Sequence, residues 1–595
     1  MNSNATLIGS IISVSSTSAV AELSPDVSSG LLILSGRSYR VGQVGSFVRI
    51  PQGYNDLFGV ISESSETSLE KEQIGFASNK RLIKIELIGE SIGYCFDRGI
   101  SQYPAVNDEV HLVLEKDLKI VYGEQGEHLF SIGTLSSSDS IDINIDLDKL
   151  ITRHSAILGS TGSGKSTSVA SLLRSIVTDQ DGKPNKSSRI ILVDIHGEYS
   201  KALKDIATVF SITPAEDEEL LSIPYWAVSP DKLLDFLCGT LNEVNKNAIL
   251  EKIKEEKKMA ITINHIENID PEKINSFTPL PFRLKKIWFD LVYKDTITVE
   301  TKADISTPSY RDEHSKGDPI QLIAPIFKPP GTGSTPPFSF GTHALTRQLE
   351  LMRTRLLNNH YSFFLEPGDW NPDANGIIKK DLDHLLQQWI GHDKPISILD
   401  LSGMPSSQFD MLLGAILDIL FESALWGRNL KAGMKNRPLL LVLEEAHRYL
   451  SGNNNGLAKD MVQRIAKEGR KFGMGLMLVS QRPSEIDETI LSQCGTLFAL
   501  RITNSSDKSR VKSAMSDGLS TIIDSLPVLR TGEAIIVGEA AKLPSRCRFK
   551  LPPANGYPDS KDPLVSKQWG KKVQEESYVK LIQSWRINKP LKEEE

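Results

Sequence analysis

The chain contains 595 residues, a length that predicts roughly two to four domains rather than one continuous core. Its composition, 39% hydrophobic and 24% charged, is typical of a soluble globular protein. The formal net charge of −7 excludes a generally basic nucleic-acid coat, so any contact with DNA must come from a local basic patch.

The cysteines and the apolar segments favour a cytoplasmic location. The four cysteines are scattered and contain no C-x-x-C pair, which argues against a disulfide framework or a zinc site and favours a reducing environment. No run approaches 18 apolar residues, and no basic segment precedes the first apolar residues. The sequence therefore predicts a cytoplasmic protein with no signal peptide and no membrane contact.

Residues 1–135 have an all-β pattern. Short runs rich in Val and Ile, such as 46–50 and 82–88, are separated by turn residues at near-regular spacing, which predicts a small barrel or sandwich. Such barrels either dock partners and subunits or bind nucleic acid. Aromatic and basic residues are not interleaved here, which favours assembly or partner docking. The polar, acidic stretch 135–155 reads as a linker with an edge strand.

A glycine-rich segment follows the apolar run 156–158 and precedes a helix-like one, with the spacing G-x-x-x-x-G-K-S of a P-loop. Glycines let successive N–H groups curl around a phosphate, and the helix N-terminus adds partial positive charge. Lys165 is expected to reach the β- and γ-phosphates of ATP, and the Ser166 hydroxyl to bind Mg²⁺. The predicted nucleotide-binding residues are Gly159, Ser160, Thr161, Gly162, Ser163, Gly164, Lys165, Ser166 and Thr167.

Strand and helix patterns alternate from 156 to about 235, which indicates a parallel α/β core. The buried run 189–193 ends at Asp194, and polar groups at the carboxyl end of a parallel strand lie where such sheets bind ligands. Asp194 is either a group that orients water around the magnesium ion or an ordinary strand-end turn residue.

The alternation of strand and helix patterns stops after residue 240 and resumes later in the chain. Residues 241–345 read as a helical insertion with a flexible Pro/Gly-rich stretch, which divides the ATPase core into a first part, 136–240, and a second part, 346–550. Residues 551–595 are predicted to form a C-terminal bracing tail, which packs against another part of the assembly, such as an adjacent subunit.

A second chemical element lies in the later half of the core. Five apolar residues, 439–443, run into Glu444 and Glu445, the pattern of a Walker B strand. We expect Glu444 to hold the magnesium ion through water and Glu445 to polarise the attacking water. His447 is either a structural residue or a contact to phosphate or DNA.

A basic run, 464–471, lies between this strand and a further core strand. Basic runs are usually solvated, but this position favours the rim of the site or a neighbouring subunit, where Arg470 can stabilise transition-state charge. Lys467 and Lys471 are candidates for lining a pore by position only. Gln481, at the end of the next strand, suits a γ-phosphate sensor.

These motifs, in this order, resemble the HerA family of DNA-translocating ATPases, in the HerA/FtsK group with a RecA-like fold. The matching stretches are 39–46, 98–104, 159–166, 194–199, 223–226, 398–403, 444–447, 468–473, 480–484 and 531–534. The resemblance implies an α/β RecA-like P-loop core with a parallel-rich sheet, an N-terminal β-barrel, and a homohexamer that threads double-stranded DNA through a central pore. Lys165, Ser166 and Glu445 would act in one subunit, and Arg470, matching the family's arginine finger, would reach in from the next.

The resemblance also implies a partner, either a NurA-like nuclease in DNA end processing or a sirtuin-like or other effector in antiphage defence. A Glu at position 444, where Asp is commoner, is usual in this family. Two functions remain open. One is an ATP-driven DNA translocase or helicase. The other is a nucleotide-binding ring that assembles and activates an effector, with translocation secondary.

Overall fold

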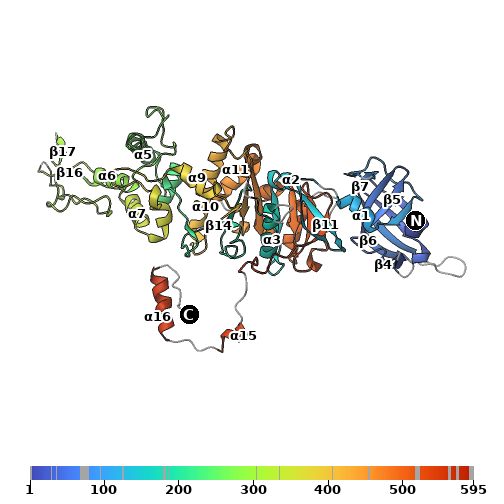
Figure 1. The fold of residues 1–595 in the computed structure, drawn as a ribbon. Helices are drawn as coiled ribbons and strands as arrows, with labels where there is room; N and C mark the ends of the chain where they lie inside the picture. Colours follow the sequence, from blue (N-terminus) through green and yellow to red (C-terminus); the bar gives the residue numbers. More distant parts are fainter. Residues whose placement is uncertain are drawn as a thin grey trace.

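The computed structural model describes residues 3–587 except 28–29, 35, 68–79, 94, 124–125, 179–182, 186–187, 303, 334, 405, 453–455, 516–522, 560–564 and 571–574. Figure 1 shows an elongated arrangement, with a β-barrel at one end, a largely helical region at the other and a broad sheet between them. The end of the expected bracing tail, 588–595, lies outside the described residues.

The N-terminal segment forms a closed barrel rather than a sandwich, in agreement with the family resemblance. Six strands pair in the order β2-β1-β9-β5-β6-β7, and β7 pairs back with β2, while β8 extends β7 on its other side. Alternate residues such as Ile83 and Ile85 point inward and are fully buried, as the two-residue period of a strand requires. The strands are β1 (Leu7–Val14), β2 (Ser18–Leu23), β5 (Phe47–Gln52), β6 (Asn55–Thr67), β7 (Lys80–Ile92), β8 (Cys95–Arg98) and β9 (Glu109–Leu112), with a separate hairpin β3 (Leu31–Leu34) and β4 (Arg37–Arg40).

The segment after the barrel belongs to the ATPase core. Helix α1 (Glu115–Tyr122) buries Val121 and Tyr122 against the core, and the Tyr122 hydroxyl hydrogen-bonds with Ser545 Oγ at 2.9 Å. Strands β10 (Leu129–Leu135) and β11 (Ser138–Asp146) form the end of the central sheet. The barrel strands therefore end well before the boundary predicted at 135, while β11 is the edge strand expected in 135–155.

The central sheet has 12 strands in the order β11-β10-β24-β23-β22-β12-β21-β20-β13-β19-β14-β15. Neighbours from β22 to β15 are parallel, and those from β11 to β22 are antiparallel. This confirms the predicted parallel-rich α/β core. The remaining strands are β12 (Ser155–Leu158), β13 (Ile190–Asp194), β14 (Ala207–Ser211), β15 (Glu219–Leu220), β19 (Ile396–Asp400), β20 (Leu439–Leu443), β21 (Met474–Ser480), β22 (Thr496–Ala499), β23 (Glu533–Gly538) and β24 (Ser545–Phe549).

Helices cover both faces of this sheet, which explains why its central strands are continuously apolar. Along β13, Ile191 and Val193 pack into the cluster that contains α10, whereas Ile190 and Leu192 pack into the cluster that contains α3. The core helices are α2 (Leu147–Thr152), α3 (Lys165–Val177), α10 (Ser406–Trp426), α11 (Leu457–Phe472), α12 (Glu488–Ser492) and α13 (Ser505–Ser513).

The helical insertion is present and also carries a small antiparallel sheet. Helix α7, which the sequence assigns to the second part of the core, packs against α4 and α6, and the first core strand after the insertion is β19. The elements are α4 (Pro230–Cys238), α5 (Glu243–Ile263), α6 (Leu284–Thr296), β16 (Thr298–Thr301), β17 (Asp304–Pro308), β18 (Phe338–Ser339), α7 (Thr346–Leu356), α8 (Ser362–Leu365) and α9 (Leu382–Ile390).

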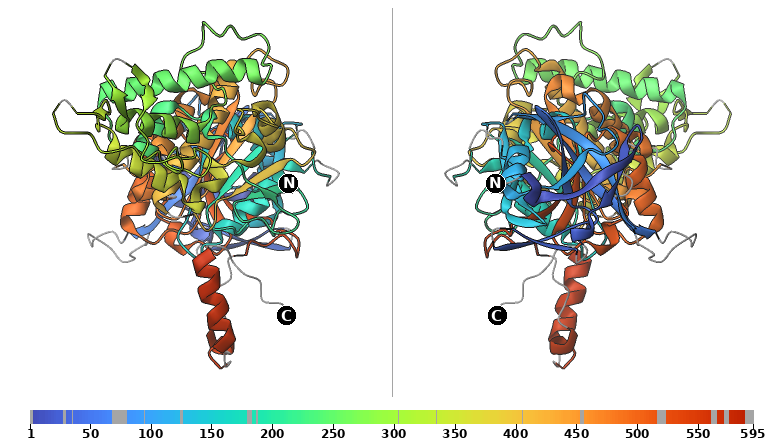
Figure 2. Two further views of the ribbon diagram at one scale, coloured as in Figure 1. Left: turned by 90° about the vertical axis from the view of Figure 1, so that its left-hand side faces the viewer. Right: turned by 90° about the vertical axis from the view of Figure 1, so that its right-hand side faces the viewer.

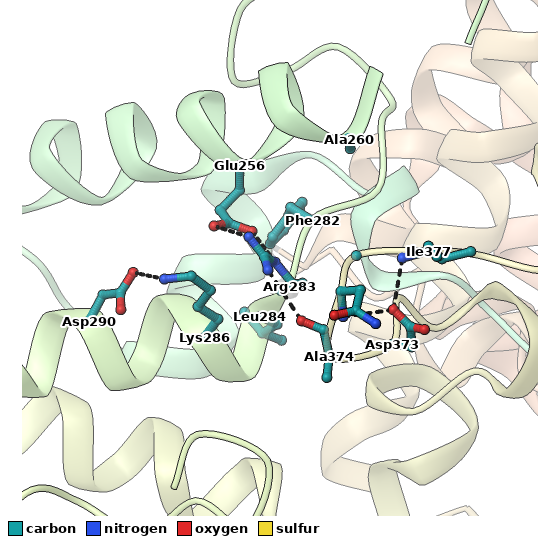
Figure 3. Close-up of polar contacts among 12 residues, drawn as sticks. Glu256, Ala260, Phe282, Arg283, Leu284, Lys286, Asp290, Asp373, Ala374 and Ile377 are labelled. Carbon is teal, nitrogen blue, oxygen red and sulfur yellow. Dashed lines mark hydrogen bonds and ion pairs between the residues drawn. The ribbon is translucent and has the colours of Figure 1, made fainter. Parts of the chain in front are cut away.

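Arg283 ties the helices of this region to the chain that returns to the core (Figure 3). Its guanidinium donates to both carboxylate oxygens of Glu256 on α5, at 2.7 and 2.9 Å, and to the Ala374 carbonyl at 3.2 Å. Asp373 closes the adjoining loop by accepting from the Ile377 N–H at 2.9 Å. These contacts therefore join α5 to the loop between α8 and α9 within the insertion.

The C-terminal segment carries α15 (Val565–Gln568) and α16 (Glu575–Ile587). Helix α16 stands apart from the body of the molecule (Figures 1 and 2). Its described apolar side chains include Tyr578, Leu581 and Trp585, and Trp585 is 73% exposed. Among the described residues, no helix combines the length and apolar character that crossing a membrane requires.

Candidate nucleotide-binding site

The P-loop lies between the carboxyl end of β12 and the start of α3, in the strand–loop–helix context that the spacing predicts. Gly162 and Gly164 have φ values of +74° and +88°, in the left-handed region that a side chain disfavours. A Cβ at Gly164 would lie 2.9 Å from the Gly532 nitrogen. The glycines thus form a tight backbone cradle at a helix N-terminus, the arrangement that binds phosphate.

Neighbouring strands hold this cradle in place. The Gly159 N–H donates to the Ser480 carbonyl at 3.1 Å, and the Gly532 N–H donates to the Ser163 carbonyl at 3.0 Å. The Arg501 guanidinium donates to the Gly162 carbonyl at 2.7 Å. The loop is therefore fixed from three sides by the ends of β21, β22 and the turn before β23.

Lys165 and Glu445 form an ion pair in the site, although they are 280 positions apart. Lys165 Nζ donates to Glu445 Oε1, and both side chains are buried, with exposed fractions of 8% and 6%. Glu445 has φ +46°, a left-handed conformation that costs a non-glycine residue free energy and is frequent at functional sites. The parallel sheet brings the P-loop lysine and the second Walker B carboxylate together.

Glu444 lies deeper, in a cluster of buried acids. Its Oε1 accepts from the Tyr199 hydroxyl at 2.9 Å. Burial, and then the nearby charge of Asp194, raise the pKa of Glu444 well above its ordinary value. Burial raises the pKa of Asp194 to about 6, against the opposing effect of the Tyr199 N–H, which donates to it at 2.9 Å.

The residues present fit a magnesium ion held mainly by phosphate and water. Among the described residues, no group of three His, Cys, Asp or Glu side chains is suited to hold a metal by itself. Mg²⁺ in phosphoryl-transfer sites keeps several waters and takes one or two carboxylates together with substrate phosphates. Glu444 Oε2 is buried and has no hydrogen-bond partner among the described residues. It can therefore accept a hydrogen bond from metal-bound water. Ser166, in the first turn of α3, is the matching hydroxyl.

Gln481 and His447 line the site beside the P-loop. Gln481 Oε1 accepts from the Thr161 hydroxyl at 2.7 Å, which places the expected sensor next to the phosphate cradle. His447 Nδ1 lies 3.2 Å from Glu445 Oε2 and 3.2 Å from Ser480 Oγ. Burial lowers the pKa of His447, so a neutral ring that orients Glu445 is favoured over a cation.

Arg470 is not brought to the P-loop of its own chain. It is exposed near the end of α11, before β21 begins, whereas the P-loop follows the end of β12, which runs parallel to β21. The seven residues of β21 separate the two edges by about 20 Å. Lys467 and Lys471, the candidate pore residues, are also exposed near this end of α11.

The sequence did not single out Arg501, Thr531 or Tyr199 as site residues. Arg501 and the Thr531 hydroxyl both donate to the Gly162 carbonyl, the latter at 3.5 Å. Tyr199 contacts both Asp194 and Glu444. Their positions in the sequence could have indicated these contacts, because Arg501 follows a core strand and Tyr199 ends the polar turn after Asp194.

Comparisons with known proteins agree with this geometry. Residues 130–420 match the family model for the central domain of helicase HerA, and residues 396–546 match that for the HerA-like C-terminal domain. The DNA double-strand break repair helicase HerA of Sulfurisphaera tokodaii is 29% identical over 488 residues, covering 80% of this chain and 78% of the relative. Its namesake from Pyrococcus furiosus is 24% identical over 538 residues, covering 84% and 82%.

Among solved structures, VirB4 of Thermoanaerobacter pseudethanolicus is similar with a TM-score of 0.46 and 14% identity, covering 72% of this chain and 98% of that one. The two matched family models together span 130–546, which includes the P-loop and both Walker B carboxylates. The chain belongs to the HerA family of helicase-type P-loop ATPases.

Proposed function

We propose that the chain is an ATP-driven translocase or helicase that forms a homohexamer and moves double-stranded DNA through a central pore. The observation that carries this proposal is the pairing of Lys165 with Glu445 at the carboxyl edge of the sheet. It unites a phosphate cradle with a carboxylate able to activate water, in a chain of a helicase family.

The proposed roles follow from these contacts. The backbone of 159–164 and Lys165 bind the phosphates, and Ser166 and Glu444 hold Mg²⁺, directly and through water. When bound, the metal neutralises charge that develops between the β- and γ-phosphates. Glu445 accepts the proton of the attacking water, Gln481 senses the γ-phosphate beside Thr161, and Asp194 orients the water around the metal.

The partner belongs to the same proposal. A NurA-like nuclease or a sirtuin-like or other defence effector would bind the ring, with the closed N-terminal barrel as the docking module. The ring would then serve DNA end processing or antiphage defence. The cytoplasmic location expected from the cysteines remains a prediction.

Arg470 provides a test of the ring. It lies about 20 Å from the P-loop of its own chain, estimated along β21, so we expect it to act on ATP held by an adjacent copy. Arg470→Ala and Lys165→Ala should each be inactive as pure proteins. A mixture assembled together should recover ATP hydrolysis, because some interfaces unite an intact Lys165 with an intact Arg470. A steady-state ATPase assay measures this, and a mixture as inactive as its components would contradict the trans geometry.

Coupling to DNA is tested by the ATPase rate with and without double-stranded DNA across a salt series. A translocase should be stimulated by DNA, and the stimulation should fall as salt rises, because cationic contacts to phosphates release counterions. Single-stranded DNA of equal phosphate concentration serves as the control. A rate that does not respond to either DNA would instead support the alternative function, a nucleotide-binding ring that assembles and activates an effector.

A further inference from the structure

The amino ends of four adjacent strands in the central sheet each carry a cation. In the sheet order β12, β21, β20 and β13, the strands are preceded by Arg153, by Arg470 with Lys471, by Arg437 and by Arg189. Neighbouring strands are about 4.8 Å apart, so the row spans about 15 Å. The carboxyl ends of the same four strands carry the P-loop, Gln481, the Walker B carboxylates and Asp194. The nucleotide site and the cation row therefore lie at opposite edges of one sheet.

These cations differ in their partners. Arg153 forms an ion pair with Glu539 at 2.5 Å. In the part of the chain that the structure describes, neither Arg189, Arg437 nor Arg470 forms an ion pair with a carboxylate. Arg437 and Arg470 are exposed and are thus available to an anion from outside this chain.

Arg189 and Arg437 are close enough to affect each other. Arg189 is buried, with an exposed fraction of 9%, and its Nε has no hydrogen-bond partner among the described residues. Burial, and then the charge of Arg437, lower the pKa of Arg189. The two residues precede neighbouring strands, with Ile190 paired to Leu440 and the Leu440 N–H donating to the Arg189 carbonyl at 3.0 Å. An anion bound beside Arg437 would offset the repulsion between these two positive charges.

The loop that carries Arg437 is fixed against the end of α11. Gly473, the residue after that helix, has φ +82°, and a Cβ there would lie 2.0 Å from the Met434 carbonyl oxygen. The Arg437 N–H donates to the Gly433 carbonyl at 3.1 Å. The close approach holds the Arg437 loop beside the helix end that presents Arg470.

The nucleotide site, in contrast, is short of positive charge. Within this chain, Lys165 is already paired with Glu445, and Arg501 donates to the Gly162 carbonyl. Burial lowers the pKa of His447, which disfavours its charged form. ATP adds several negative charges to a site that already contains acids, so a cation from an adjacent copy would add to the charge that Mg²⁺ and Lys165 neutralise.

We propose that Arg437, backed by Arg189, contacts the terminal phosphates of ATP held by an adjacent copy of this chain, beside Arg470. This inference rests on the ring in the proposed function, because only a repeated head-to-tail contact brings the amino edge of one copy to the carboxyl edge of the next. Arg437 is then a catalytic residue that acts in trans, and Arg189 is a positioning residue that holds an unpaired charge behind it.

The test replaces Arg437 with glutamine in the full chain. Arg437→Gln should lower kcat for ATP hydrolysis by about 100-fold, less than for removal of a sole arginine finger because Arg470 remains. Affinity for ATP at the P-loop should change little, because the contact is strongest in the transition state. Lys435→Gln, two residues earlier on the same exposed loop, is the matched control and should retain normal turnover. Equal turnover of Arg437→Gln and the natural protein would overturn the proposal.

A mixing experiment shows whether Arg437 acts in trans. Arg437→Gln assembled with Lys165→Ala should recover turnover, since about a quarter of randomly formed interfaces contain both intact residues. The Arg470→Ala mixture with Lys165→Ala runs in parallel. If that mixture recovers and the Arg437 mixture does not, the ring stands and this inference falls. If neither recovers, the ring itself is wrong.

Two further measurements separate the remaining explanations. If Arg437→Gln does not assemble alone, its mixture with Lys165→Ala still tests whether Arg437 acts in trans. The Arg437→Lys variant keeps the positive charge and should assemble. Its turnover should lie between that of Arg437→Gln and that of the natural protein. Binding of double-stranded DNA by Arg437→Gln should be unchanged. Lost DNA binding with intact DNA-free turnover would overturn the proposal and assign Arg437 to the DNA backbone instead.

Discussion

Replacing Lys165 with alanine should abolish ATP hydrolysis, with a loss of at least about 10³-fold in kcat/KM. Lys165 is a buried cation in the first turn of the helix that follows the phosphate cradle, and removal of a group that stabilises transition-state charge on phosphoryl oxygens causes losses of this order. A radiometric or coupled ATPase assay measures the effect. Lys201→Ala, at an exposed position, is a suitable control and should retain normal turnover.

The same substitution also removes one partner of a buried ion pair. Leaving Glu445 without Lys165 should destabilise the nucleotide-free protein, by about 3 kcal/mol, because one buried charge loses its partner. The double variant Lys165→Ala/Glu445→Gln should regain much of that stability in thermal unfolding and remain inactive. Normal turnover in Lys165→Ala would refute the assignment of the P-loop.

Glu445→Gln should bind ATP and fail to hydrolyse it, with kcat lowered by about 10²–10⁴-fold. The glutamine keeps the size of the side chain but cannot accept a proton from water, which is the contribution of a general base. Quench-flow or filter-binding measurements should show ATP retained on the protein. Glu216→Gln, on an exposed loop, is the control.

Release of phosphate at the natural rate by Glu445→Gln would place the base elsewhere. Glu444 is the alternative to examine next, because it is buried beside Glu445 and holds the Tyr199 hydroxyl. The substitution should also free Lys165 from its ion pair, so ATP affinity is expected to rise rather than fall.

Local motifs made much of the site predictable. The P-loop is a continuous segment, and the apolar strand before Glu444 is short and unbroken, so both are visible in the sequence alone. Their meeting was also expected, since parallel strands deliver their carboxyl ends to one edge of a sheet. The contacts of Tyr199 with Glu444 and of Arg501 with Gly162 join residues 245 and 339 positions apart, and no local pattern encodes them.

The same limit applies to the fold. The all-β N-terminal domain, the parallel-rich core and the insertion follow from the periodicity of the apolar residues and from breaks in the strand–helix alternation. The choice of a barrel over a sandwich came from the family resemblance. The position of β10 in the central sheet does not follow from such patterns, because β10 pairs with β24 more than 400 residues later, at Gly133 and Phe549. Its alternating pattern fits the last strand of a barrel equally well, and only the distant partner decides between the two sheets. The small sheet of β16, β17 and β18 inside the insertion was missed for a different reason: its strands are too short to show a period.

The pairing of β10 with β24 has a practical consequence for dividing the protein. A fragment that began at 136 would leave β24 with an open row of N–H and C=O groups, the kind of edge that recruits other chains and aggregates. It would also lose α1, whose Val121 and Tyr122 fill part of the core. A motor fragment that keeps both α1 and β10 must therefore begin between the end of β9 at Leu112 and the start of α1 at Glu115. It would expose the surface against which Phe58 and Phe96 of the barrel pack, so that surface needs polar substitutions.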